Sequence, residues 1–231
     1  MSAAGFFGKV RTHGDFVARR LPAAFIEPWD RSVQAGMLEA RLRYGAQWLP
    51  LYLNAPVWRF ALGASLCGEE AWVGVLMPGV DRVGRYFPFT LACPLAHAQL
   101  ANWLRGGQAW FDAAAELALS TLAPAFDLER FDETVHVLDA GTGLDSDNGA
   151  PWRYACVPEG HEPEDEEPCV ALGECLATRA AMGESMWWSE GSAAVPAALR
   201  ISAGLLDGPR FADLLDVAQA PWRTAIALRS A

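Results

Sequence analysis

Two apolar segments separated by a short charged link constrain this chain more than any other feature. Most of both segments and the whole link lie within residues 74–94, GVLMPGVDRVGRYFPFTLACP. The first apolar segment is a strand-type run over residues 72–77. That run stops at a Pro-Gly pair, and aromatic and β-branched residues resume over residues 86–91. Apolar runs broken by a proline-glycine link are typical of two strands joined by a loop.

The loop carries one acidic and two basic residues, Asp81, Arg82 and Arg85, between strands that we expect to be buried. Charges in or near a protein interior must be paired. The triplet is therefore either a structural ion-pair centre or a recognition surface. Two arginines three residues apart in a loop are also suited to holding an acidic or phosphorylated segment of a partner.

Arg59 is a second charged residue in an apolar context, because it lies between two large aromatics in the expected strand 57–62. A buried arginine needs a carboxylate or several carbonyls, and its planar fork suits a bidentate acid. Asp15 and Asp81 are the candidate acids. The candidate cluster is Asp15, Arg59, Asp81, Arg82 and Arg85. It either pins the loop to the sheet or recognises a partner, and both roles are compatible.

The pair Trp187-Trp188 falls in an expected strand at 186–189, where successive side chains point to opposite faces. One indole exposed on the surface would be a natural interface anchor. The alternative is a three-layer fold in which both faces are packed.

The order of helical and strand patterns predicts an α/β protein, a three-layer α/β/α sandwich around a mixed β-sheet, folded as one domain over 1–231. Expected strands are 5–10, 57–62, 72–77, 87–93 and 186–189. Expected helices are 22–44, 47–53, 97–122 with a break at 106–107, 126–137 (or a helix leading into a strand), 174–182 and 209–217. A short helical turn is expected over 14–20. Pro28 predicts a kink or break near Glu27.

Composition excludes several classes of protein. The 231 residues are 52% hydrophobic with 10 Trp, which indicates a folded core. The net charge of −10, with Lys9 as the only lysine, disfavours binding to nucleic acid. The five cysteines form no Cys-x-x-Cys pair. The N-terminus lacks a signal-peptide pattern, and no apolar run approaches the ~20 residues of a membrane span. A cytoplasmic location is expected.

No motif supports catalysis, a metal or a cofactor. The sequence around Gly8-Lys9 lacks the first glycine and the following hydroxyl residue of a phosphate loop. A nucleophile elbow is absent, and the four histidines are dispersed. His161 lies within the acidic stretch 158–168, which is more typical of a solvated loop than of a metal site. We therefore expect neither metal nor cofactor.

Motifs along the chain resemble those of the TagF family, also called ImpM, which is associated with type VI secretion. They include Gly8-Lys9, Gly14-Asp15-Phe16, Trp29-Asp30, Trp48-Leu49, Trp58-Arg59-Phe60, the 74–94 segment, Trp187-Trp188 and the 211–215 segment. The specific part is 1–94, whereas 95–231 is more generic, with helices and loops. The resemblance implies a non-enzymatic cytoplasmic protein that represses secretion after translation by binding the forkhead-associated scaffold protein (Fha).

Two alternatives from other classes remain open. One is a small phosphate- or nucleotide-binding hydrolase that uses the acid–arginine cluster at the strand ends, where open α/β sheets usually bind ligands. The other is a structural subunit of the secretion assembly, for which a large exposed apolar patch would be the sign. The sequence gives neither the sheet order nor the oligomeric state.

Overall fold

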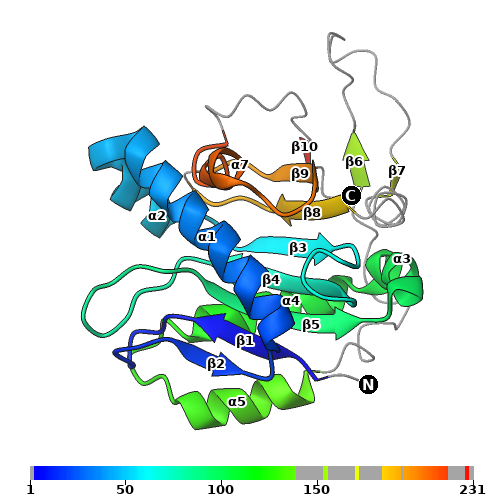
Figure 1. Cartoon of the computed structure of the whole chain (residues 1–231), viewed down its shortest axis with the longest axis horizontal. Helices are drawn as coiled ribbons and strands as arrows, with labels where there is room; N and C mark the ends of the chain where they lie inside the picture. The colour runs from blue at the N-terminus through cyan, green and yellow to red at the C-terminus, as the bar shows by residue number, and fades with distance from the viewer. Residues whose placement is uncertain are drawn as a thin grey trace, which may run out of the picture.

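A seven-stranded sheet forms the centre of the protein in the computed structural model, which describes residues 3–138, 153–155, 170–171, 184–193, 195–217 and 227–228 (Figure 1). The strands are β1 (Gly5–Gly8), β2 (Val17–Arg19), β3 (Trp58–Leu62), β4 (Ala71–Met77), β5 (Phe89–Leu95), β8 (Glu184–Ser189) and β9 (Ala198–Ala203). Their order is β2-β1-β5-β4-β3-β8-β9. A separate sheet of β10 (Ala227–Leu228), β6 (Arg153–Ala155) and β7 (Val170–Ala171) accompanies it.

Every neighbouring pair of strands in the large sheet is antiparallel, so the expectation of a mixed sheet is wrong. Short links join β1 to β2, β3 to β4, β4 to β5 and β8 to β9, and each pair lies side by side. A short link reverses the chain direction, whereas a parallel pair needs a long crossover. The α/β class itself is confirmed.

Helices cover both faces of the sheet, as the three-layer prediction requires (Figure 1). One layer holds α1 (Ala23–Tyr44), the 3-10 turn η1 (Gly45–Gln47), α2 (Trp48–Asn54) and α7 (Gly208–Ala212). The opposite layer holds α3 (His97–Gly106), α4 (Gln108–Ser120) and α5 (Leu128–Val137). Successive side chains of β4 point to opposite faces of the sheet, so the strand contributes to both cores. Val73 and Val75 lie on the α4 side, and Trp72 and Leu76 lie on the α1 side.

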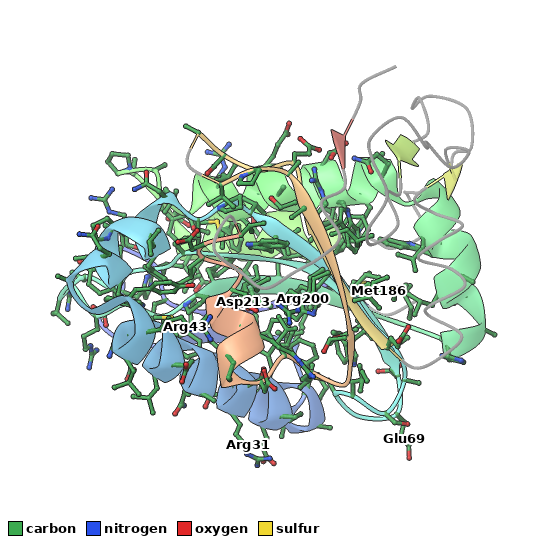
Figure 2. All side chains as sticks on the ribbon, turned by 90° about the horizontal axis from the view of Figure 1, so that it is seen from above. Arg31, Arg43, Glu69, Met186, Arg200 and Asp213 are labelled. Carbon is green, nitrogen blue, oxygen red and sulfur yellow. The ribbon has the colours of Figure 1, made fainter. Side chains whose placement is uncertain are left out.

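Helix α7 is fixed to its neighbours by a buried carboxylate. Asp213, directly after the helix, lies between Arg43 of α1 and Arg200 of β9 (Figure 2), with N–O distances of 2.6 and 2.8 Å. Gly36 lets α1 approach α7 closely, because an added Cβ would lie 2.2 Å from Cγ of Phe211. Together these contacts pack α7 against the long helix α1.

Most expected elements are present, with a few corrections. The predicted break at 106–107 separates α3 from α4. Pro28 does not break α1, because it lies near the start of the helix, where one missing N–H costs one bond, while Phe25 and Trp29 on either side are packed in the core. The helical turn expected over 14–20 is instead strand β2, whose Val17 pairs with Gly8.

Two elements near the C-terminus were misjudged from sequence. Strand β9 was not predicted, because its ALRISA sequence has little β-branched or aromatic character. Helix α7 is shorter than the expected 209–217. The predictions for the acidic stretch 158–168 and the helix 174–182 lie outside the described residues. None of the helices in the described part of the chain combines the length and apolar character needed to cross a bilayer.

Candidate functional site

The loop between β4 and β5 is closed at its base by a buried tyrosine. The Tyr52 hydroxyl donates to the Gly79 carbonyl at 2.9 Å and accepts from the Gly79 N–H at 2.8 Å. Burial raises the pKa of Tyr52, so its hydroxyl stays protonated. Gly79 is tightly enclosed, since an added Cβ would lie 2.4 Å from the Phe87 carbonyl oxygen. The two ends of the loop are therefore held close together.

Asp81 organises the rest of the loop. Its side chain is fully buried, and each carboxylate oxygen accepts two hydrogen bonds. Oδ1 accepts the backbone N–H groups of Val83 (3.0 Å) and Arg85 (2.8 Å). Oδ2 accepts from Lys9 Nζ (2.5 Å) and Arg85 Nε (2.7 Å). Burial alone would raise the pKa of Asp81, but these donors outweigh it and hold that pKa well below its usual range.

The loop is also joined to residues 9–16, which follow β1. The Arg82 N–H donates to the His13 carbonyl at 2.9 Å, and Arg85 Nη2 donates to the Gly14 carbonyl. Lys9 Nζ lies 4.9 Å from the centroid of the Phe16 ring, within cation–π range. Both segments emerge at the same end of the sheet (Figure 1).

This double loop exposes several side chains, including Arg11 and Asp15, and we call four of them the arginine surface: Phe16, Arg82, Val83 and Arg85. Phe16 is 43% and Val83 is 65% exposed. The Arg85 side chain is 58% exposed although its Nε binds Asp81. Arg82 is exposed, and its guanidinium has no hydrogen-bond or ion-pair partner within the described residues. Exposed guanidinium groups with free N–H donors are suited to binding anions.

The five charged residues expected to cluster do not form one group. Asp15 is exposed next to the loop, and its Oδ1 accepts the N–H of Phe16 at 2.8 Å. Arg59 lies elsewhere, on the face that carries α4, where it binds Asp112 at 2.7 Å and Glu190 at 2.9 Å. Its side chain points to the opposite face of β3 from Trp58 and Phe60, and Asp81 is bonded instead by Lys9, Val83 and Arg85.

The central cation of the network, Lys9, was missed as a site residue. Its side chain is 6% exposed and contacts Asp81, 72 positions away in the sequence. One signal was present, since it is the only lysine in a chain that otherwise uses arginine. Gly8 before it has φ +145°, and an added Cβ would lie 2.3 Å from the Pro88 carbonyl oxygen, so the chain there passes directly against the loop.

Trp187 and Trp188 are both buried, each about 2% exposed, on opposite faces of β8. Trp187 packs against Trp29 and Phe60, with ring centroids 5.6 and 5.3 Å apart. Trp188 packs edge-on against Phe111 of α4 at 4.7 Å. Both faces of the strand are thus covered, and neither indole is available as a surface anchor in this conformation.

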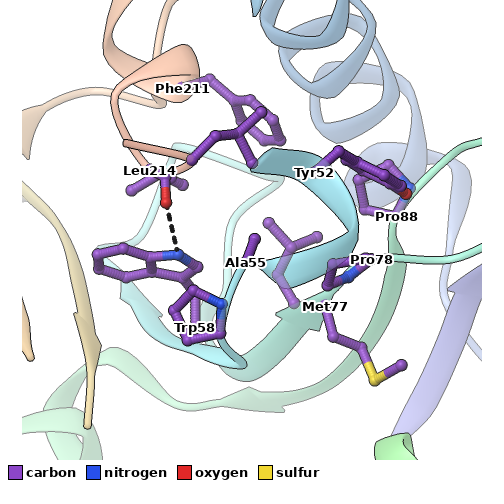
Figure 3. A pocket seen from close by; sticks show the side chains of 11 residues that line it. Tyr52, Ala55, Trp58, Met77, Pro78, Pro88, Phe211 and Leu214 are labelled. Carbon is purple, nitrogen blue, oxygen red and sulfur yellow. Dashed lines mark hydrogen bonds between the residues drawn. The ribbon is translucent and has the colours of Figure 1, made fainter. Parts of the chain in front are cut away.

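An apolar pocket lies beside the base of the loop, between α2, α7 and the start of β3 (Figure 3). Its empty space is ≈ 280 Å³, including the part open to solvent. The Trp58 indole N–H at its wall donates to the Leu214 carbonyl at 3.2 Å. The remaining lining is almost wholly apolar and includes Tyr52, Pro78, Pro88 and Phe211. This pocket offers packing space but no polar groups for chemistry.

Comparison with known proteins assigns the chain to a family. The sequence model described as "TagF N-terminal domain, Type VI secretion system-associated" matches residues 5–138. The chain belongs to the TagF family. The structure is also similar to the crystal structure of PA0076 from Pseudomonas aeruginosa PAO1, with 39% sequence identity and a TM-score of 0.72. That match covers 92% of this chain and 94% of the other. A search of curated proteins gave no significant match.

The part that matches the TagF N-terminal domain contains the whole of the loop network, from Lys9 to Arg85, together with Arg59 and Asp112. Helix α7, strands β8 and β9, and Glu190 lie beyond it. As a TagF-family protein, this chain is associated with type VI secretion. The arginine surface therefore lies within the part of the chain that matches the TagF N-terminal domain.

Proposed function

We propose that this protein is a non-catalytic regulator that represses a type VI secretion system after translation, in the cytoplasm, by binding the forkhead-associated scaffold protein Fha. Membership of a type VI secretion-associated family is the observation that carries the proposal. Repression by binding requires an exposed, pre-organised surface, and the arginine surface has both properties.

The environment of Asp81 supports binding over catalysis at this site. A general base needs a free carboxylate oxygen within reach of the substrate proton, and a metal ligand needs one directed at the ion. Both Asp81 oxygens instead accept bonds from Lys9, Val83 and Arg85, and the lowered pKa makes the group a poor proton acceptor. The acid–arginine cluster is therefore better suited to holding a loop than to hydrolysing a phosphate.

The test is direct capture. The purified protein is immobilised and offered purified Fha from the same secretion system, and its fold is checked by circular dichroism. We expect saturable capture, and we expect overproduction of the protein in the host to reduce secretion without reducing Fha abundance. A folded protein that neither captures Fha nor affects secretion would contradict the proposal. A thermal shift with nucleotides or phosphorylated compounds would instead favour the hydrolase alternative, and stable co-assembly without repression would favour a structural subunit.

A further inference from the structure

We infer that the arginine surface is the docking site for a partner segment that combines carboxylate and apolar side chains. This inference deepens the proposed function, since it names the surface and the chemistry of the bound segment. The loop is asymmetric. Both oxygens of the buried Asp81 carboxylate are bonded, whereas the exposed side chains of Arg82 and Val83 make no hydrogen bond or ion pair in the described part of the chain.

The Asp81 network makes this tip rigid before any partner arrives. Four donors hold one buried carboxylate, and further bonds join the loop to the carbonyls of His13 and Gly14. A pre-organised loop loses less conformational entropy on binding than a flexible one. Burying the Asp81 carboxylate and the Lys9 ammonium costs free energy. In return, their bonds hold the exposed side of the loop in one shape.

The sign of the charge identifies the partner chemistry. Residues 9–16 and 78–88 carry four fixed positive charges, Lys9, Arg11, Arg82 and Arg85, against two carboxylates, Asp15 and Asp81. The whole chain carries −10, so these two segments differ in sign from the molecule as a whole. Complementary local charge steers and orients a binding partner, and carboxylates match the guanidinium fork.

Two exposed apolar side chains set a second requirement. Val83 lies at the tip between the two arginines, and Phe16 stacks on Phe7 and packs edge-on against Phe87 beside it. A purely acidic segment would leave these groups in water, whereas an apolar residue flanked by acids would cover them. The arrangement therefore fits a mixed acidic and apolar peptide.

A short protein segment fits this surface better than an extended polyanion. Nucleic acid or an anionic bilayer would bring many negative charges against a molecule of net charge −10, and repulsion beyond the local surface would oppose binding. A peptide segment touches only the arginine surface. Charge repulsion elsewhere is then screened within about one Debye length, roughly 8 Å at physiological salt.

The experiment measures binding of a short fluorescein-labelled peptide of alternating glutamate and leucine by anisotropy, at several salt concentrations. Arg82→Glu and Val83→Asp are the test variants, because these exposed side chains make no hydrogen bond or ion pair with the described residues. Arg31→Glu is the matched control: it makes the same charge change at an exposed arginine of α1 that has no partner in the described residues. Unchanged thermal melts confirm that all variants fold.

We expect Arg82→Glu to weaken peptide binding by about tenfold or more, Arg82→Lys to weaken it less, and Arg31→Glu to have little effect. Equal losses in Arg82→Glu and Arg31→Glu would show a net-charge effect and overturn the inference. So would the absence of peptide binding, or tighter binding of a DNA duplex or of phosphatidylserine vesicles.

The same variants separate this inference from the proposed function. If the parent protein captures Fha but Arg82→Glu and Val83→Asp do not, both statements are supported. If all three capture Fha equally, the docking surface is refuted while repression by binding still stands. If the parent captures no Fha, the proposed function fails, and the peptide titration alone decides the inference.

Discussion

Asp81 is the residue on which the candidate site most depends, and its protonation gives a pH-dependent prediction. The pKa of a carboxylate is lowered in the folded state when its charged form is bonded, so the stability it contributes is complete above its unfolded pKa and is lost as pH falls through its lower folded pKa. For Asp81, this stability begins to be lost near pH 3.8, the ordinary pKa of the group, and the loss continues below pH 2 because the folded pKa is much lower.

We therefore expect Asp81→Asn to be less stable than the parent at pH 7 and the difference between them to shrink as pH falls from 4 towards 2. The variant keeps the size of the side chain but leaves the buried Lys9 without its anion. Urea unfolding at a series of pH values measures both proteins. A difference that stays constant down to pH 2 would show that folding does not lower the pKa of Asp81.

Tyr52→Phe tests the base of the loop. The phenylalanine ring refills the same space, but it leaves the buried Gly79 N–H without a partner. The Gly79 carbonyl loses one of two bonds and still accepts from the Phe87 N–H. Unsatisfied buried groups cost about 1–3 kcal/mol, so we expect a loss of that size by chemical denaturation. Tyr86→Phe is the control, since its ring packs against the same cluster and no hydrogen bond involves its hydroxyl in the described structure. Equal effects of the two changes would contradict this role for Tyr52.

Among the elements, the crossing of α1 and α7 depends on the lack of a side chain at Gly36. In an exposed helix, Gly→Ala stabilises by about 1 kcal/mol. Here the added methyl group meets the Phe211 ring, so we expect Gly36→Ala to destabilise the protein by about 1–3 kcal/mol.

The double variant Gly36→Ala/Phe211→Leu shows whether this contact is the cause. The smaller leucine makes room for the methyl group, so the two changes should cost less together than the sum of the single changes. Thermal unfolding of the four proteins in the cycle measures the coupling. Simple additivity would indicate that Gly36→Ala acts through something other than Phe211.

The whole molecule should unfold as one unit, because a single sheet supplies side chains to both cores. Trp29→Ala removes a ring from the α1 face, and Trp110→Ala removes one from the α4 face; each indole is about 1–2% exposed. Each change should cost roughly 3–5 kcal/mol and lower one shared transition. Leu42→Ala, at a site 73% exposed, should have little effect.

Far-ultraviolet circular dichroism measures the loss of secondary structure, and tryptophan fluorescence measures the loss of packing in the two cores. In each protein, parent or variant, the unfolding curve from circular dichroism should coincide with the one from fluorescence, as expected for a single cooperative domain. Separate transitions, each sensitive to only one of the two tryptophans, would contradict a single domain over the whole chain.

The sequence by itself determined the class of the fold and most of its elements, since local periodicity is enough to distinguish helices from strands. It also indicated the family and the charged loop, because Asp81, Arg82 and Arg85 are close together along the chain. Those features depend on neighbouring residues, which a sequence displays directly. Strand β9 escaped prediction because its own residues have little strand character, so its pairing with β8 decides it.

Only the tertiary structure decided which charges pair. Lys9 pairs with Asp81, and Arg59 pairs with Asp112 and Glu190. These partners are far apart along the chain, and their spatial proximity is not visible in the sequence. The antiparallel order, with β8 beside β3, placed both Trp187 and Trp188 in packed cores. The physical reason is that a buried charge or ring selects its partner by three-dimensional proximity, which the sheet order and the side-chain alternation of the assembled strands determine.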